Sequence, residues 1–241
     1  MLLTFLSPFA QDISAIIKEA GRLESIPDEK AAFARFREVL KIKSTEVYAL
    51  SKCSELCSRI GKRETDSKSR DNYYKAARIY AATALKVDLL NSDANCAMAM
   101  ALGRATMSKS GKEKIITARE IRKYVDQAIK SDPGNFKAWH VLGRWHYEIS
   151  NLNLFERAAV NILFGGLPES SIKESIAAFE KSQSITRGFI LNYFELAKAY
   201  RRNNEMDRAI ISLNTMLTLP NQTEDDPLIK LEGKKLLGRW K

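Results

Sequence analysis

The sequence is poor in the residues that build disulfides, metal sites and short strands. Its 241 residues include three cysteines, two histidines and six prolines, and glycine occurs eleven times. The glycines and prolines lie mostly at the ends of apolar segments, which favours an all-helical protein over one made of strands and tight turns. No apolar run reaches the roughly 20 residues that a membrane-spanning helix requires.

The cysteines do not form a recognisable framework. Their number is odd and the spacing of Cys53, Cys57 and Cys96 is irregular, which argues against a set of disulfides. Cys53 and Cys57 lie four residues apart on one expected helix, where the geometry suits a disulfide poorly. A single pair of this kind is also a weak metal signal. We therefore predict that all three are small core residues between packed helices.

Catalytic motifs are missing as well. The sequence contains no nucleophile elbow, P-loop or dinucleotide fingerprint. His140 and His146 are six residues apart, so they point to different faces of a helix, and no cysteine or carboxylate cluster completes a metal site around them. The sequence predicts no catalytic residue, no metal and no cofactor, and we expect a protein that is not an enzyme.

What the sequence has in excess is positive charge. The formal net charge is +10 and the pI is about 9.5, while 45% of the residues are hydrophobic. Such a charge suggests an acidic partner, which could be an acidic peptide tail, a nucleic acid or an anionic membrane surface. The alternative is that the excess of lysine and arginine only keeps the helices soluble.

One stretch carries a repeat signature. Trp139, Leu142 and Gly143 reproduce the W-x-x-L-G core of a tetratricopeptide (TPR) repeat, a unit of about 34 residues made of two antiparallel helices. These residues and His146 follow i, i+3, i+4, i+7 spacing, so they share one helix face. The large side chain fills the gap between paired helices, and the glycine beside it lets the second helix come close. His146 stands where the repeat usually has tyrosine.

Helical periodicity recurs along the whole chain, with polar or turn-forming residues between segments. It predicts an all-α, TPR-like superhelix of antiparallel helix pairs, with a helical insertion in one repeat and a C-terminal capping helix. We divide the chain into an N-terminal apolar segment with leading helices at 1–43 and a repeat domain at 44–241. The expected helices are 12–22, 27–42, 44–61, 71–88, 94–107, 115–131 and 135–150, then a repeat at 188–220 and a last helix from 226.

The repeat spacing locates the insertion. The interval from Trp139 to the next anchor, Tyr193, exceeds one repeat by about 20 residues, which places an insertion at about 151–171. The intervals between the earlier anchors, Ala49, Cys96 and Trp139, are also too long. We assign their surplus to loops that emerge at one edge of the superhelix. Two of these loops are basic and contain Lys62, Arg63, Lys68 and Arg70, and Lys109, Lys112 and Lys114.

Several stretches resemble one known family. The segments LGRWHY, LFERAAVNILFGGLPESSIKESIAAFEKS, LAKAY and LPNQTEDD are similar to the regulator of microtubule dynamics family. The resemblance covers roughly Ser44 to Lys241 and is densest from Leu142 to Asp226, where it includes the insertion. It implies an all-α adaptor domain with a TPR-like fold and association with microtubules. It implies no catalytic residue.

The first helices of TPR repeats line a concave groove, and the positions facing it can be counted from each anchor. Here they are mainly basic and aromatic, so they could clamp carboxylates and pack apolar side chains of an acidic polypeptide such as a tubulin tail. The alternative is that the C-terminal cap or the N-terminal helices fill the groove. The candidate groove residues are Arg104, Lys137, His140, Arg144, Tyr147, Leu191, Phe194, Lys198, Arg201 and Arg202.

Two other functions stay open. The basic loop edge could bind anionic lipid or nucleic acid by charge alone, although the alternating aromatic residues typical of base stacking are missing there. The protein could instead be an exported structural scaffold, because residues 1–11 resemble the later half of a signal peptide, but no basic stretch precedes them. We expect a cytoplasmic protein, with export as the alternative.

Overall fold

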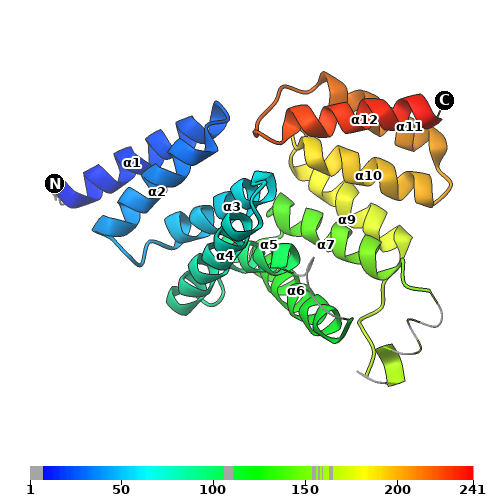
Figure 1. The fold of residues 1–241 in the computed structure, drawn as a ribbon, viewed down its shortest axis with the longest axis horizontal. Coiled ribbons are helices and arrows are strands. Elements are labelled where there is room, and N and C mark those ends of the chain that lie inside the picture. Colours follow the sequence, from blue (N-terminus) through cyan, green and yellow to red (C-terminus); the bar gives the residue numbers. More distant parts are fainter. Residues whose placement is uncertain are drawn as a thin grey trace, which may run out of the picture.

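The computed structural model describes residues 8–105, 111–153, 156, 158, 160–162 and 165–240, and all regular structure in these ranges is helical. Antiparallel helix pairs follow one another along the molecule (Figure 1). The helices are α1 (Pro8–Ser25), α2 (Glu29–Ile42), α3 (Val47–Arg63), α4 (Ser67–Val87), α5 (Ser92–Ala105), α6 (Gly111–Ser131), α7 (Phe136–Ile149), α9 (Ile172–Ile185), α10 (Ile190–Arg202), α11 (Met206–Thr218) and α12 (Asp226–Trp240).

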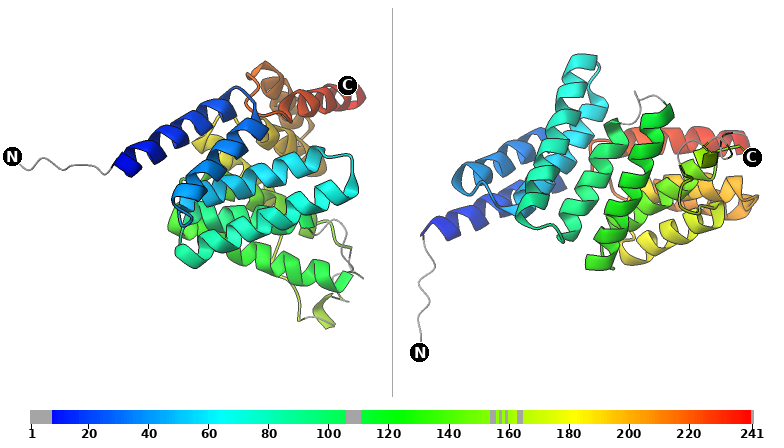
Figure 2. Two further views of the ribbon diagram at one scale, coloured as in Figure 1. Left: turned by 60° about the vertical axis from the view of Figure 1, so that its left-hand side comes forward. Right: turned by 90° about the horizontal axis from the view of Figure 1, so that it is seen from below.

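The repeat helices form two layers. In the inner layer α3, α5, α7 and α10 contact one another in sequence, and α4, α6, α9 and α11 each pack against the helix that precedes them. Helix α12 packs on α10 and α11, so it caps the last pair. Figure 2 shows the same succession of pairs from two further directions, with α1 and α2 at one end and α12 at the other. The predicted all-α, TPR-like fold is confirmed.

Short polar side chains start several of these helices. Asp28, Asp66, Asn135 and Ser171 each accept a hydrogen bond from the backbone N–H three residues further on, at the beginning of α2, α4, α7 and α9. Each bond satisfies an N–H group that has no partner inside the helix and stabilises the helix by about 1 kcal/mol. These polar capping residues therefore define where the helices begin.

The repeat signature acts as the sequence predicts. A Cβ atom added to Gly143 would lie 2.6 Å from the ring of Phe179 on α9, so only glycine allows this approach of α7 and α9. Ser175 and Ser182 tighten the same contact, because their hydroxyl groups each donate at 2.8 Å to a backbone carbonyl oxygen of α7, those of Gly143 and Phe136.

The two basic loops are not where we expected them. The connection between α3 and α4 is only Glu64–Asp66, and both α4 and α6 have 21 residues. Longer helices, rather than loops, thus absorb much of the surplus between repeat anchors. The prediction was wrong because a polar, charged stretch is also compatible with an exposed helix. Lys62, Arg63, Lys68, Arg70, Lys112 and Lys114 are helical, and Lys109 lies outside the described residues.

All three cysteines are free and buried, as predicted, and burial raises the pKa of the Cys57 thiol to about 12.

Of the insertion predicted at 151–171, the described part turns back at Gly165 and Gly166, whose φ angles are +68° and +81°. Within the described residues no helix is both long and apolar enough to cross a membrane. The domain boundary at residue 43 stays a prediction.

Candidate functional site

We define the inner face as the side chains that α3, α5, α7 and α10 present to one another and to solvent. It holds the predicted groove residues other than His140. Around Tyr147 the structure brings several of them together. The Lys198 ammonium lies 5.4 Å from the ring centroids of both Tyr147 and Phe194. The Arg202 guanidinium lies 5.1 Å from the Tyr147 centroid and donates at 2.8 Å to the carbonyl oxygen of Tyr147. This is a basic and aromatic cluster of the kind the sequence predicts.

Most cations of the inner face are already paired within the chain. The Lys137 ammonium lies 2.6 Å from a carboxylate oxygen of Glu55 on α3. Arg144 pairs with Glu195 on α10 and with Glu148 on its own helix, and Lys198 donates at 2.9 Å to the second oxygen of Glu195. Glu55 and Glu195 are buried, and their pKa values are lowered because the attraction of these cations exceeds the effect of burial. Lys137 thus links α7 to α3 and Arg144 links α7 to α10, so these cations are engaged within the chain.

His140 does not line the inner face. Its ring is buried and packs against Phe179 and Phe189, with centroid distances of 5.4 and 4.8 Å. Its Nδ1 lies 3.0 Å from Oδ1 of Asn192, whose Nδ2 donates to the carbonyl oxygen of Phe179. This orientation of the amide makes Nδ1 the donor. Burial lowers the pKa of His140 to about 4, so the ring is neutral and belongs to the core.

Because of this burial, His140 should make stability depend on pH. The pKa is about 4 in the folded protein and about 6.5 in an unfolded chain, so the stabilisation is complete above pH 6.5 and is lost as pH falls toward 4. Between pH 6.5 and 4 the free energy of unfolding should fall by up to about 1.4 kcal/mol per pH unit. His140→Gln should reduce the slope in urea titrations. Part of the slope should remain from His146, whose pKa burial also lowers, and at the acid end from carboxylates with lowered pKa values such as Glu195. An unchanged slope would refute this assignment.

Arg104 differs from the other predicted cations. It is half-buried at the end of α5, and in the part of the chain that the structure describes its guanidinium makes no hydrogen bond and no ion pair. Burial lowers its pKa, while the nearby Tyr74, Asp225 and Glu195 act in the opposite direction. Arg201 is exposed at the end of α10. Of the predicted groove residues, these two offer charge to an outside carboxylate most directly.

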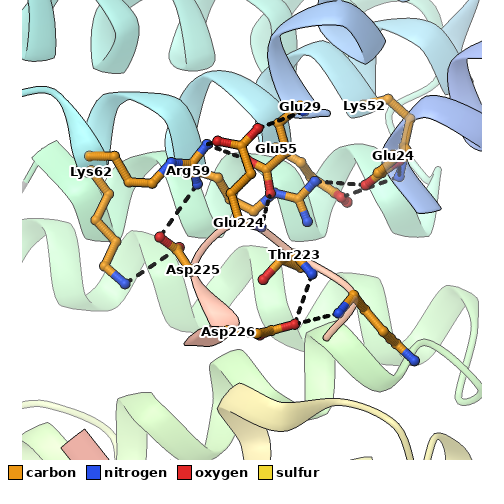
Figure 3. Close-up of polar contacts among 12 residues, drawn as sticks. Glu24, Glu29, Lys52, Glu55, Arg59, Lys62, Thr223, Glu224, Asp225 and Asp226 are labelled. Atoms are coloured by element: carbon orange, nitrogen blue, oxygen red, sulfur yellow. Dashed lines mark hydrogen bonds and ion pairs between the residues drawn. The ribbon is translucent and has the colours of Figure 1, made fainter. Parts of the chain in front are cut away.

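The sequence analysis missed the acidic members of the site. Glu55 is the one charged side chain among the buried residues of α3, and Glu195 is the one among those of α10. A lone charge on a buried helix face is the signal that could have indicated them. It also missed the acidic loop before α12, which reaches α2 and α3. This loop contacts Glu29 and Lys62 (Figure 3) and also Arg63. No group of three or more potential metal ligands occurs within the described ranges.

Stacked helix pairs with polar side chains along an inner layer define a TPR-like repeat protein, a class whose curved faces serve as binding surfaces. The chain belongs to the family described as Regulator of microtubule dynamics protein 1-3, whose family model matches residues 16–241. A crystal structure of a thermophilic TPR protein from Thermus thermophilus superposes with a TM-score of 0.66 at 12% identity, covering 93% of this chain and 98% of that one.

Two relatives illustrate the extent of the sequence match. Regulator of microtubule dynamics protein 2 of Homo sapiens is 24% identical over 222 residues, which is 92% of this chain and 52% of the human protein. Regulator of microtubule dynamics protein 1 of Caenorhabditis elegans is 29% identical over 126 residues, 52% of this chain and 56% of the worm protein. The chain thus spans about half the length of these relatives.

Proposed function

We propose that this protein is a non-catalytic adaptor that binds an acidic polypeptide on its inner face and takes part in microtubule regulation, with a tubulin tail as a candidate partner. The family and the TPR-like fold support protein binding in general. The net charge of +10 favours an acidic partner. The proposal places the protein in the cytoplasm, and fractionation of cells that express the full-length protein would test this against export.

The observation that carries the proposal is the guanidinium of Arg104, which has no ion-pair partner among the described residues. A half-buried arginine without an ion-pair partner loses hydration and gains only the longer-range attraction of groups such as Asp225. A ligand carboxylate placed there gains a charge-assisted hydrogen bond. The Tyr147 cluster, with Lys198 and Arg202 over the ring, adds apolar area and positive charge on the neighbouring inner helices.

The test is calorimetric titration with a glutamate-rich peptide at low and at physiological salt. Arg104→Gln should weaken binding by about 10- to 100-fold, the value of one charge-assisted hydrogen bond. Arg187→Gln, which removes an arginine at the start of the last repeat, is the matched control and should change affinity by less than about threefold. Equal effects of the two substitutions would show that only the overall charge matters, and the inner-face site would be rejected.

A second candidate function is the binding of an anionic lipid headgroup outside the inner face. Helix α6 borders a surface hollow of about 430 Å³ that also touches Pro168 of the insertion. Its basic lining residues would attract phosphate groups by charge. Vesicles with anionic headgroups would bind through this face independently of Arg104. The basic residues of the lining are Arg119, Arg122, Lys123 and Lys130.

A further inference from the structure

Three consecutive acidic residues, Glu224, Asp225 and Asp226, lie where the loop after α11 enters α12, and the first two contact the opposite end of the repeat array. The Glu224 carboxylate accepts a hydrogen bond of 2.8 Å from the backbone N–H of Glu29 and lies 3.1 Å from the Arg63 guanidinium. Asp225 lies 3.4 Å from Lys62 (Figure 3) and also 3.4 Å from Arg63. We call Glu224 and Asp225 the acidic segment. It joins parts of the chain about 195 residues apart.

The surface that receives the acidic segment is organised by residues outside it. The N–H of Glu29 belongs to the first turn of α2, where the helix dipole favours negative charge. Arg63 is held in place by a 2.6 Å contact with the buried carboxylate of Glu29, which Arg59 also contacts at 3.3 Å. The Glu29 N–H, Lys62 and Arg63 therefore form a carboxylate site, of which the Glu29 N–H and Arg63 are held by contacts outside the acidic segment.

The ion pairs of the acidic segment are longer than the 2.6 Å contact between Arg63 and Glu29, although Asp225 is buried and Glu224 also accepts the 2.8 Å bond from Glu29. These ion pairs with Lys62 and Arg63 span 3.1–3.4 Å, longer than the 2.7–2.9 Å of strong charge-assisted hydrogen bonds. Glu224 and Lys62 retain 32% and 35% of their side-chain exposure, so water competes for them. The start of α12 does not depend on these contacts, because Asp226 accepts hydrogen bonds from the N–H groups of Gln222 and Thr223.

The chemistry of the site matches the ligand class of the proposed function. We infer that the acidic segment is an internal ligand, and that an acidic polypeptide binds the carboxylate site of Glu29, Lys62 and Arg63 by displacing it. This inference rests on the proposed function and adds a second point of contact for the polypeptide, beside Arg104. Asp225 acts electrostatically on Arg104 as well as on Lys62, so the displaced carboxylates would leave both cations to the incoming chain.

Calorimetry with a decaglutamate peptide tests the inference. Glu224→Gln with Asp225→Asn should bind the peptide about tenfold more tightly than the wild type, because the competing carboxylates are gone. The control, Glu120→Gln with Glu232→Gln, makes the same change in net charge at two exposed positions and should alter affinity by less than about threefold. Adding Lys62→Gln to the first variant should weaken its peptide binding by at least about threefold.

Hydrogen exchange on the wild-type protein gives a readout that does not depend on any substitution. Saturating peptide should accelerate exchange of the Glu224 amide, which donates to the Glu29 carboxylate at 3.4 Å. Peptide binding without this acceleration, or equal affinities of the two double variants, would overturn the displacement while Arg104-dependent binding would still support the proposed function. If no variant binds the peptide, the proposed function fails and the inference with it.

Discussion

Replacing Phe179 with alanine is expected to lower the free energy of unfolding by about 3–5 kcal/mol. The side chain is fully buried and fills the space between α7 and α9. It also contacts the His140 ring and belongs to a core cluster with Leu196 and Tyr200 of α10. Its loss leaves a cavity that three helices border, and these cannot all collapse into it because each also packs elsewhere. Urea unfolding at neutral pH measures the effect.

Gly143→Ala provides the internal check. In the wild type the added methyl group meets the Phe179 ring at 2.6 Å, so the cost of overpacking, about 1–3 kcal/mol, should exceed the helix propensity gained. In the Phe179→Ala background the methyl group has room, and the substitution should be neutral or stabilising. Gly103→Ala is the control and should not destabilise, because among the described residues no atom beyond the neighbouring helix backbone lies within 4 Å of the new Cβ. If the effects of Gly143→Ala and Phe179→Ala were additive, contact with the Phe179 ring would not be the reason that residue 143 must be glycine.

Lys137→Met is expected to cost about 3 kcal/mol, because it leaves the buried Glu55 carboxylate without its closest cation. Lys52 lies 3.9 Å from the same carboxylate and offsets only part of this loss. The attraction of Lys137 and Lys52 lowers the pKa of Glu55 to about 2. The stabilisation is therefore present above the unfolded-state pKa of about 4.3 and disappears as pH falls from there toward 2.

The double variant Lys137→Met with Glu55→Leu should recover most of the lost stability, since it removes both charges and leaves apolar side chains of similar length. Lys123→Met on the exposed side of α6 is the matched control and should change the free energy of unfolding by less than about 0.5 kcal/mol. A double variant as unstable as Lys137→Met alone would show that packing, rather than the unpaired charge of Glu55, causes the loss.

The helix pairs could be predicted because their signals are local. The W-x-x-L-G core places Gly143 on the face that meets the next helix, and the polar residues Asn135 and Ser171 mark where α7 and α9 begin. Ser175, Phe179 and Ser182 lie four and three residues apart on one face of α9, and such a local spacing is visible in a sequence even beyond an insertion. The prediction from repeat spacing was wrong where it assigned the surplus residues to basic loops, because a long polar stretch can also form an exposed helix.

For the candidate site, too, local features could be predicted from the sequence and long-range contacts could not. The sequence by itself determined the two-layer helical fold, the family and the basic, aromatic character of the inner helices, because these follow from residue types at helical spacing. Only the tertiary structure decided which of those cations are paired within the chain. Lys137 and Glu55 are 82 residues apart, Arg144 and Glu195 are 51 apart, and Glu29 and Glu224 are 195 apart. Such pairs depend on how successive helix pairs rotate against each other, a sum of many small packing angles that no local pattern encodes.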